Sequence, residues 1–249
     1  MLQNQRHERI LRQLELNHAV KVAELAKDLN ISESTIRRDI IELDKAGKLK
    51  KVFGGAVPTT VSMVSAYTDV AERDLISTEE KDRIAKYAAT LIEDDDFVYI
   101  DAGTTTHRMI DYLENKNATY VTNGIAHAEK LVQRGFDVYM IGGMLRPMTE
   151  AAVGASAIES LKRYNFTKCF MGTNGIDIRG GFSTPHISEG AMKTAAIQNS
   201  CISFILADHT KFGKLSSVTF AGLDEAYIIT DRVEDEAYLK AAQIKQIDF

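Results

Sequence analysis

The chain has 249 residues, of which 45% are hydrophobic, and its formal net charge at pH 7 is −5. A chain of this length and composition can bury a substantial core, and it contains no run of eighteen apolar residues that would indicate a membrane-spanning helix. The N-terminal stretch MLQNQRHERILRQ lacks the apolar core of a signal peptide, so we expect a cytoplasmic protein without membrane association.

Cysteine and histidine usage argues against disulfide and metal chemistry. Cys169 and Cys201 lie in or beside apolar runs, which predicts reduced, buried thiols. The six histidines show neither zinc-ligand spacing nor an HExxH motif, and the EDDD run at 93–96 resembles a solvated turn. We therefore expect no metal site and no cofactor.

Charge is distributed unevenly along the chain. Residues 1–60 contain eleven Lys or Arg and eight Asp or Glu, which gives +3. The other residues hold the remaining 19 basic and 27 acidic side chains, which gives −8. This sign change indicates a small basic unit, suited to a polyanion, joined to an acidic body.

Three short helices are predicted in the basic unit. Apolar residues at helical spacing indicate one helix that begins near Gln5 and a second that ends at Asn30. Ser32 is a favourable N-cap for a third helix, which we expect to reach about Ala46 because Gly47 supplies a C-terminal stop.

A small β-ribbon should follow the third helix. The segment KLKKVFGGAV alternates basic and apolar residues and should turn at Gly54 and Gly55. Three helices followed by such a ribbon form a winged helix-turn-helix, which we place at residues 1–57.

The third helix should present a polar face to DNA. Its isoleucine and leucine side chains form one stripe, while Ser34 and Arg38, flanked by Thr35 and Arg37, lie on the opposite side. An ordinary solvated face is the alternative explanation, but the surrounding helix-turn-helix pattern favours major-groove contact. The wing lysines would then meet phosphates. The predicted DNA-binding residues are Ser32, Ser34, Thr35, Arg37, Arg38, Lys48, Lys50 and Lys51.

These residues carry a family resemblance. The segment RHERILRQLELNHAVKVAELAKDLNISESTIRRDIIELDKAGKLKKVFGGAV resembles the DNA-binding head of the DeoR/GlpR family of bacterial sugar-metabolism regulators. The shared features are the helix order, STIRRD, and GGA after the wing. Phe53 stands where many members have His, and Ile40 where Leu is usual, but neither lies on the groove face. The resemblance implies double-stranded operator DNA as a partner.

Residues 58–75 have the composition of an interdomain linker. They contain Pro58 and small polar residues, and they lack a long apolar stripe. Beyond them, Ser77 and Glu80 form a predicted capping box for a helix with a buried apolar face.

Strands and helices alternate from residue 76 to 249. The apolar runs FVYI, ATYVT, DVYMI, KCFMG, CISFILAD and EAYIIT are each followed by a polar loop, most of which lead into a helical pattern. Unbroken apolar strands joined in this way predict an α/β domain with a mostly parallel sheet covered on both faces.

Ligands of such sheets bind at the carboxyl ends of the strands, and the loops there carry suitable groups. DAGTTT places hydroxyl groups at a predicted helix N-terminus, which favours an anion such as phosphate. Small polar residues are also common in ordinary turns, so each loop alone is a weak signal. Together the loops predict an effector site formed by Asp101, Gly103, Thr104, Thr105, Thr106, Thr122, Asn123, Gly142, Gly143, Arg146, Asp177, Glu189, Lys193 and Lys211.

The body also resembles the family's C-terminal sensor domain, which shares its fold with ribose-5-phosphate isomerase. That resemblance implies that DAGTTT binds phosphate and that residues 175–193 contact sugar hydroxyls. Asp177 and Glu189 fall near acidic active-site positions of the isomerase, but Arg179 stands where the isomerase has lysine. From spacing alone, Glu189 and Lys193 could equally form a surface ion pair.

The sequence therefore predicts a transcriptional regulator, most simply a repressor of a carbohydrate-utilisation operon, controlled by a phosphorylated sugar bound to residues 76–249. We expect no catalytic residues and a homo-oligomer, dimer or tetramer, because two-fold operators need paired heads. The alternative is a sugar-phosphate isomerase with an appended DNA-binding head. An RNA-binding module would need an aromatic stacking surface that the sequence lacks.

Overall fold

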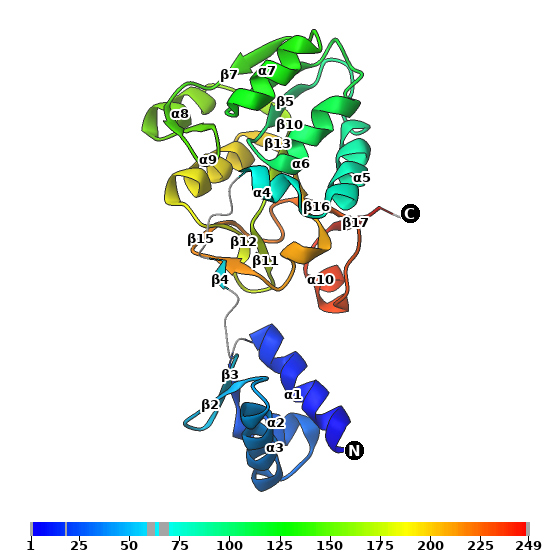
Figure 1. Ribbon diagram of the computed structural model, residues 1–249, viewed down its shortest axis with the longest axis vertical. Coiled ribbons are helices and arrows are strands. Elements are labelled where there is room, and N and C mark those ends of the chain that lie inside the picture. The colour runs from blue at the N-terminus through cyan, green and yellow to red at the C-terminus, as the bar shows by residue number, and fades with distance from the viewer. Residues whose placement is uncertain (1, 18, 59–62, 65–69, 248–249) are drawn as a thin grey trace. The chain divides into compact units, whose positions relative to one another are not determined.

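The computed structural model describes residues 2–17, 19–58, 63–64 and 70–247 (Figure 1). The chain divides into two compact units, Met1–Met63 and Val64–Phe249. We call the first unit the head and the second the body.

The head contains the three predicted helices and a three-stranded sheet of order β1-β3-β2. The bounds are α1 Gln3–Asn17, β1 Val20–Lys21, α2 Val22–Leu29, α3 Glu33–Lys45, β2 Lys50–Val52 and β3 Gly55–Val57. Its core is its own and includes Ile36, Ile40 and Leu43 from α3, as the helical stripe predicted.

Local sequence fixes the helix ends in the head. Asn30 ends α2 in the left-handed conformation, with φ of 52°, which asparagine tolerates better than most residues. The hydroxyl of Ser32 accepts a hydrogen bond from the backbone N–H of Thr35 at 3.4 Å, which confirms the predicted N-cap. Gly47 has φ of 69° and allows the chain to leave α3.

The wing turns one residue earlier than predicted. Phe53 and Gly54 form the turn, with φ of 78° at Gly54, and Gly55 is the first residue of β3. Strand β1, which the sequence did not predict, pairs with β3. A Cβ atom at Gly55 would lie 1.9 Å from the carbonyl oxygen of Val20, so only glycine permits this close pairing.

A buried ion pair joins α1 to α3. The carboxylate of Asp39 accepts hydrogen bonds from Nε of Arg6 at 2.5 Å and from Nη2 of the same guanidinium at 2.7 Å. Burial raises the pKa of Asp39, but the hydrogen bonds and charge of Arg6, with a further contribution from His7, more than offset it, and the pKa is lowered overall. Asp39 therefore stays charged inside the head.

The body contains a seven-stranded, fully parallel sheet of order β17-β16-β13-β10-β5-β6-β7, which confirms the predicted parallel arrangement. Its strands are β5 Phe97–Ile100, β6 Thr119–Thr122, β7 Val138–Met140, β10 Phe166–Gly172, β13 Ser200–Leu206, β16 Tyr227–Thr230 and β17 Ile244–Gln246.

Both faces of this sheet are buried, as expected of parallel strands (Figure 1). Along β5, Tyr99 belongs to one apolar core, whereas Val98 and Ile100 belong to the other. The helices of the body are α4 Val70–Asp74, α5 Thr78–Ala89, α6 Thr104–Met109, α7 Ile125–Gln133, α8 Ala155–Leu161, α9 Ile187–Gln198 and α10 Glu236–Ala241, with short 3-10 turns η1 Ile110–Tyr112 and η2 His209–Lys211.

Smaller elements decorate the main sheet. A three-stranded sheet of order β11-β12-β15 and a β8/β9 hairpin both lie outside the predicted strand–helix repeat. The bounds are β8 Met144–Arg146, β9 Ala151–Val153, β11 Gly175–Asp177, β12 Gly181–Thr184, β14 Leu215–Ser216 and β15 Val218–Ala221.

Two local predictions are wrong. Ser77 precedes α5 with φ of 51° and makes no side-chain capping bond, so the predicted capping box is not formed. Cys169 is buried as expected, but Cys201 is exposed. The segment 58–75, predicted as a linker, includes β4 Met63–Val64 and helix α4, whereas residues 59–62 and 65–69 lie outside the described structure.

Candidate functional site

The predicted DNA-contacting side chains lie on the surface of the head. On α3, Ser34, Arg37 and Arg38 are exposed and Thr35 is half-buried. Glu33 accepts a hydrogen bond from Nη2 of Arg37 at 2.8 Å. The three wing lysines Lys48, Lys50 and Lys51 are exposed as well. The predicted face is therefore accessible to a partner.

The wing is held against α3. The backbone N–H of Lys51 donates to the carboxylate of Asp44 at 2.9 Å, and Phe53 at the tip of the wing is completely exposed. Ser32 combines exposure with its structural role as the cap of α3.

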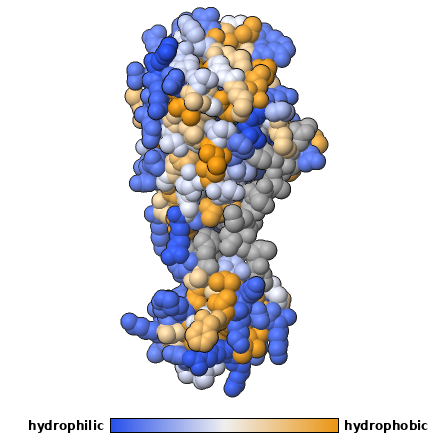
Figure 2. All heavy atoms as spheres, turned by 90° about the vertical axis from the view of Figure 1, so that its left-hand side faces the viewer, coloured by the Kyte–Doolittle hydropathy of each residue, from blue (hydrophilic) through white to orange (hydrophobic). Residues whose placement is uncertain are grey.

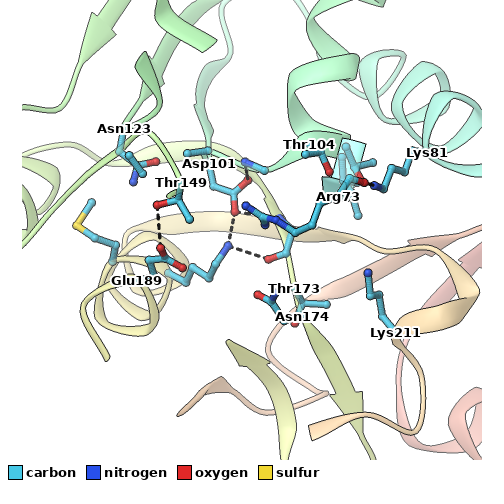
Figure 3. Close-up of a pocket in the computed structure, with 18 of the residues that line it drawn as sticks. Arg73, Lys81, Asp101, Thr104, Asn123, Thr149, Thr173, Asn174, Glu189 and Lys211 are labelled. Atoms are coloured by element: carbon cyan, nitrogen blue, oxygen red, sulfur yellow. Dashed lines mark hydrogen bonds and ion pairs between the residues drawn. The ribbon is translucent and has the colours of Figure 1, made fainter. Parts of the chain in front are cut away.

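A pocket opens in the body at the carboxyl ends of the central strands (Figure 3). Asp101 follows β5, Asn123 follows β6, Gly172 ends β10 and Asp208 follows β13, which is where ligands of open α/β sheets bind. The predicted effector residues that line the pocket are Asp101, Gly103, Thr104, Thr105, Asn123, Glu189, Lys193 and Lys211.

Asp101 organises the middle of the pocket. Its buried carboxylate accepts hydrogen bonds from the backbone N–H groups of Gly103 at 3.1 Å and Gly172 at 3.0 Å, and from the hydroxyl of Thr106 at 2.9 Å. The ammonium group of Lys193 completes this set and also donates to the carbonyl of Gly172 at 2.8 Å. Asp101 and Lys193 thus neutralise each other, rather than Glu189 and Lys193.

One end of the pocket is cationic. Figure 3 shows Arg73, Lys81 and Lys211 on the same side of the pocket, with Thr104 beside them. Lys81 is only 3% exposed, and its ammonium group donates to the backbone carbonyl of Arg73. Burial, together with the charge of Lys211, lowers the pKa of Lys81 to about 8. Burial likewise lowers the pKa of Lys211, whose Nζ lies 3.8 Å from the carboxylate of Asp208.

The opposite end carries the carboxylate of Glu189 and uncharged polar side chains (Figure 3). Glu189 accepts a hydrogen bond from the hydroxyl of Thr149 at 2.9 Å and lies 3.3 Å from Nε of Arg146. Asn123 uses its amide to hold the fold, because it accepts from the hydroxyl of Tyr99 and donates to the carbonyl of Ala152, both at 3.0 Å. This end offers hydroxyl and carboxylate oxygens.

Six predicted effector residues lie outside the pocket lining, and three of them are engaged in local contacts. Thr106 is fully buried beneath Asp101, and Thr122 accepts from the backbone N–H of Gly124 at 3.1 Å. The carboxylate of Asp177 accepts hydrogen bonds from the backbone N–H groups of Arg179 and Gly180 at 3.0 and 2.7 Å. The full set outside the lining is Thr106, Thr122, Gly142, Gly143, Arg146 and Asp177.

Sequence reasoning missed Arg73 and Lys81. Lys81 could have been found, because it lies three residues before Ile84 on the buried face of α5, where a cation is unexpected. Arg73 gave no comparable signal, since it falls within the segment predicted as a linker. The helix that begins at Thr104, within DAGTTT, has only six residues, and Arg73, Lys81 and Lys211 supply side-chain positive charge at this end.

Two clusters of possible metal ligands occur among the described residues, where the sequence predicted none. In the head, His7 and Glu42 lie beside Asp39, which Arg6 already neutralises. In the body, Glu80, His209 and Asp231 lie close together, with Nδ1 of His209 2.7 Å from a carboxylate oxygen of Asp231. That histidine–aspartate pair holds the start of η2, which carries Lys211.

Comparison with known proteins agrees with both units. Residues 6–61 match the family model described as a DeoR-like helix-turn-helix domain, and residues 76–232 match the DeoR C terminal sensor domain. The chain belongs to the DeoR family. This membership makes it a DNA-binding transcriptional regulator with a sensor domain, and not the isomerase considered as an alternative.

Relatives of this DeoR-family regulator match it along nearly the whole chain. An uncharacterized HTH-type transcriptional regulator FruR of Bacillus subtilis (strain 168) is 39% identical over 236 residues, which cover 94% of this chain and 93% of the relative. The lactose phosphotransferase system repressor of Staphylococcus aureus (strain NCTC 8325 / PS 47) is 32% identical over 241 residues, covering 95% and 94%.

The structure of ribose 5-phosphate isomerase from Methanocaldococcus jannaschii has a TM-score of 0.41 and 15% identity, with 54% of each chain covered.

No helix among the described residues of this regulator is long and apolar enough to cross a membrane.

Proposed function

We propose that this DeoR-family regulator is a cytoplasmic repressor of a carbohydrate-utilisation operon and that a phosphorylated sugar in the body pocket controls it. The pocket carries the proposal, because its two ends match the two chemical parts of such a ligand. Three basic side chains at one end suit a phosphate, and Glu189 and Thr149 at the other suit sugar hydroxyls. The Staphylococcus aureus relative, a lactose phosphotransferase system repressor, supports the same assignment.

The effector would lie across Asp101 and Lys193, with its phosphate near Thr104, Thr105 and Lys211. The residues that do not line the pocket would support those that do. Thr106, for example, fixes Asp101, and Arg146 neutralises Glu189. A single cationic end favours one phosphate group per ligand.

In the head, we propose that Ser34, Thr35, Arg37 and Arg38 contact base edges and adjacent phosphates of operator DNA. Lys48, Lys50 and Lys51 would contact phosphates from the wing. The support is the exposure of all of these side chains except the half-buried Thr35, on or beside the predicted groove face.

Two-fold operators require paired heads, so we propose that the body self-associates. Its edge strand β7 and the nearby β8 expose the large apolar residues Tyr139, Met140, Met144 and Leu145. Figure 2, which faces the side of the body that carries α8, shows several patches of apolar side chains on that surface. The occupant would be a second copy of this chain, because antiparallel pairing of β7 with its own copy satisfies the free edge of both sheets.

Sedimentation of the full chain tests this interface. Leu145→Lys should shift the chain toward monomer, whereas Leu239→Lys, at an exposed apolar position on α10, should leave the assembly unchanged. A monomeric wild-type chain, or an unchanged assembly of the Leu145 variant, would contradict the proposal.

The effector proposal is tested by thermal melting of the full chain with phosphorylated hexoses, pentoses and polyols, each beside its unphosphorylated form. A specific effector raises the melting temperature by mass action, and its unphosphorylated form should not. The same compound should reduce or increase affinity for a DNA fragment selected from a random pool, and it should remain chemically unchanged. Absence of any phosphate-dependent stabilisation would reject the sugar-phosphate assignment.

A further inference from the structure

Arg73 lines the pocket with one edge of its guanidinium group unpaired in the described part of the chain. Its Nε and Nη2 atoms are buried, and neither has a hydrogen-bond partner among the described residues. These two atoms form one edge of the guanidinium group, which is the edge that binds carboxylates and phosphates through two parallel hydrogen bonds. A buried donor without a partner is costly, and two on one edge indicate that this edge serves an external acceptor.

The surroundings of Arg73 determine the charge of that acceptor. Lys81 from α5 and Lys211 from η2 line the same pocket, and Thr104 from α6 adds a hydroxyl. The carboxylate of Asp208 lies 3.8 Å from Lys211, that of Asp74 is paired with Arg108, and that of Asp101 is paired with Lys193. The excess of positive charge selects an anion.

Arg73 is not committed to its neighbour Asp74. The carboxylate and the backbone carbonyl of Asp74 instead accept hydrogen bonds from Nη2 of Arg108 on α6, at 3.0 and 3.2 Å. Lys81 donates to the backbone carbonyl of Arg73. These contacts hold α4 on the body through its backbone and through Asp74, and they leave the side chain of Arg73 for the pocket.

We propose that Arg73 is an effector-binding residue that grips the phosphate group through Nε and Nη2, together with Lys81 and Lys211. This assignment rests on the proposed function of the pocket and names the group that completes it. Helix α4 begins at Val70, directly after residues 65–69 on the path from the head. The phosphate thereby bonds to the first described helix of the body after the DNA-binding unit.

Regulation follows from this placement. A ligand held by Arg73 stabilises the docked state of α4, because the ligand binds that state more tightly than one in which α4 is displaced. DNA that favours a different state of this segment must then lower ligand affinity by the same factor by which the ligand lowers DNA affinity.

Calorimetry on the full chain tests the role of Arg73, with inorganic phosphate as the probe at constant ionic strength. Arg73→Gln should weaken phosphate binding by roughly tenfold or more, because it removes a charge-assisted bidentate contact. Arg73→Lys keeps the charge without the paired donors and should fall between Arg73→Gln and wild type. Arg232→Gln, at a half-exposed arginine paired with Glu234, is the matched control and should bind as wild type does.

Each outcome is decisive. Wild-type affinity in Arg73→Gln, with an unchanged melting temperature, would overturn the assignment of Arg73 while leaving the effector site intact. If neither inorganic phosphate nor any sugar phosphate binds the wild-type chain, the proposed function of the pocket fails instead. If Arg73→Gln lowers the melting temperature, the Arg73→Lys variant decides. A purely structural contribution of Arg73 would be restored neither by the positive charge of lysine nor by added phosphate.

Discussion

Arg6 in the head and Arg73 in the body present the same edge of a guanidinium group to different surroundings. The Nε and Nη2 atoms of Arg6 bind the buried carboxylate of Asp39, which the chain itself supplies. The same atoms of Arg73 are buried without a partner among the described residues. An acceptor that the fold itself supplies contributes to stability, whereas an acceptor that arrives from outside can be sensed by the protein.

The largest expected effect tests the head side of this comparison. Arg6→Ala should destabilise the head by about 3 kcal/mol, because it leaves the carboxylate of Asp39 buried without its main partner. Urea denaturation followed by circular dichroism measures this loss, and affinity for selected DNA should fall with it. A stability change below about 1 kcal/mol would show that His7 alone can neutralise Asp39.

A negative charge introduced into the pocket tests the body side of this comparison. Thr105→Glu places a carboxylate in the pocket lining and should weaken binding of a phosphorylated ligand by about a hundredfold. The head has its own core, so binding to selected DNA should persist and become insensitive to the ligand. Unchanged ligand affinity in calorimetry would place the phosphate elsewhere.

The recognition face of α3 should show a smaller and more selective effect. Arg38→Ala should remove about 1–3 kcal/mol of discrimination between selected and random DNA, because a base contact is lost. Lys50→Ala should weaken binding to both DNAs equally and reduce the salt dependence. Equal losses on both DNAs for the Arg38 variant would argue against direct readout by this side chain.

The smallest expected effect is a pH dependence of ligand binding. Burial and the charge of Lys211 lower the pKa of Lys81 to about 8, Asp208 and Asp74 oppose this shift, and Arg108 adds to it. A phosphate monoester is already a dianion above pH 7, so changes in affinity there report on the protein. Affinity should fall about tenfold per pH unit above pH 8, as bound ligand requires the protonated lysine.

Lys81→Arg should flatten that pH profile, because arginine keeps its charge. The free energy of unfolding should depend on pH in the opposite direction from ligand affinity. The folded-state pKa of Lys81 lies below its usual value of 10.5, so the unfolded chain binds more protons between pH 8 and 10.5. The free energy of unfolding contributed by this group therefore rises with pH across that window. A flat binding profile for the wild-type chain would show that Lys81 does not face the phosphate.

Regular local patterns made most of the fold predictable. The stripe of Ile36, Ile40 and Leu43 and the cap at Ser32 specify α3, and the apolar runs specify the parallel strands. The segments after β5, β6 and β13 also identified six pocket residues, because carboxyl ends of parallel strands share one edge, and Glu189 and Lys193 join them from α9.

What the sequence did not reveal depends on contacts between distant segments. Strand β1 has only two residues and exists because β3 pairs with it. Helix α4 has five residues and little apolar character, and Arg108 anchors it from 34 positions away. The role of Asp177 within its own turn likewise depends on side-chain direction, which spacing alone does not give.

The two cysteines give this chain a built-in position for a fluorescent label. Burial raises the pKa of the Cys169 thiol, so that group resists maleimide reagents, whereas Cys201 is exposed. Cys201 lies near the start of β13, and Leu206 at the other end of that strand lines the pocket, about 16 Å away along an extended chain. A dye on Cys201 would therefore sit clear of the ligand and could report on the body without any engineered residue.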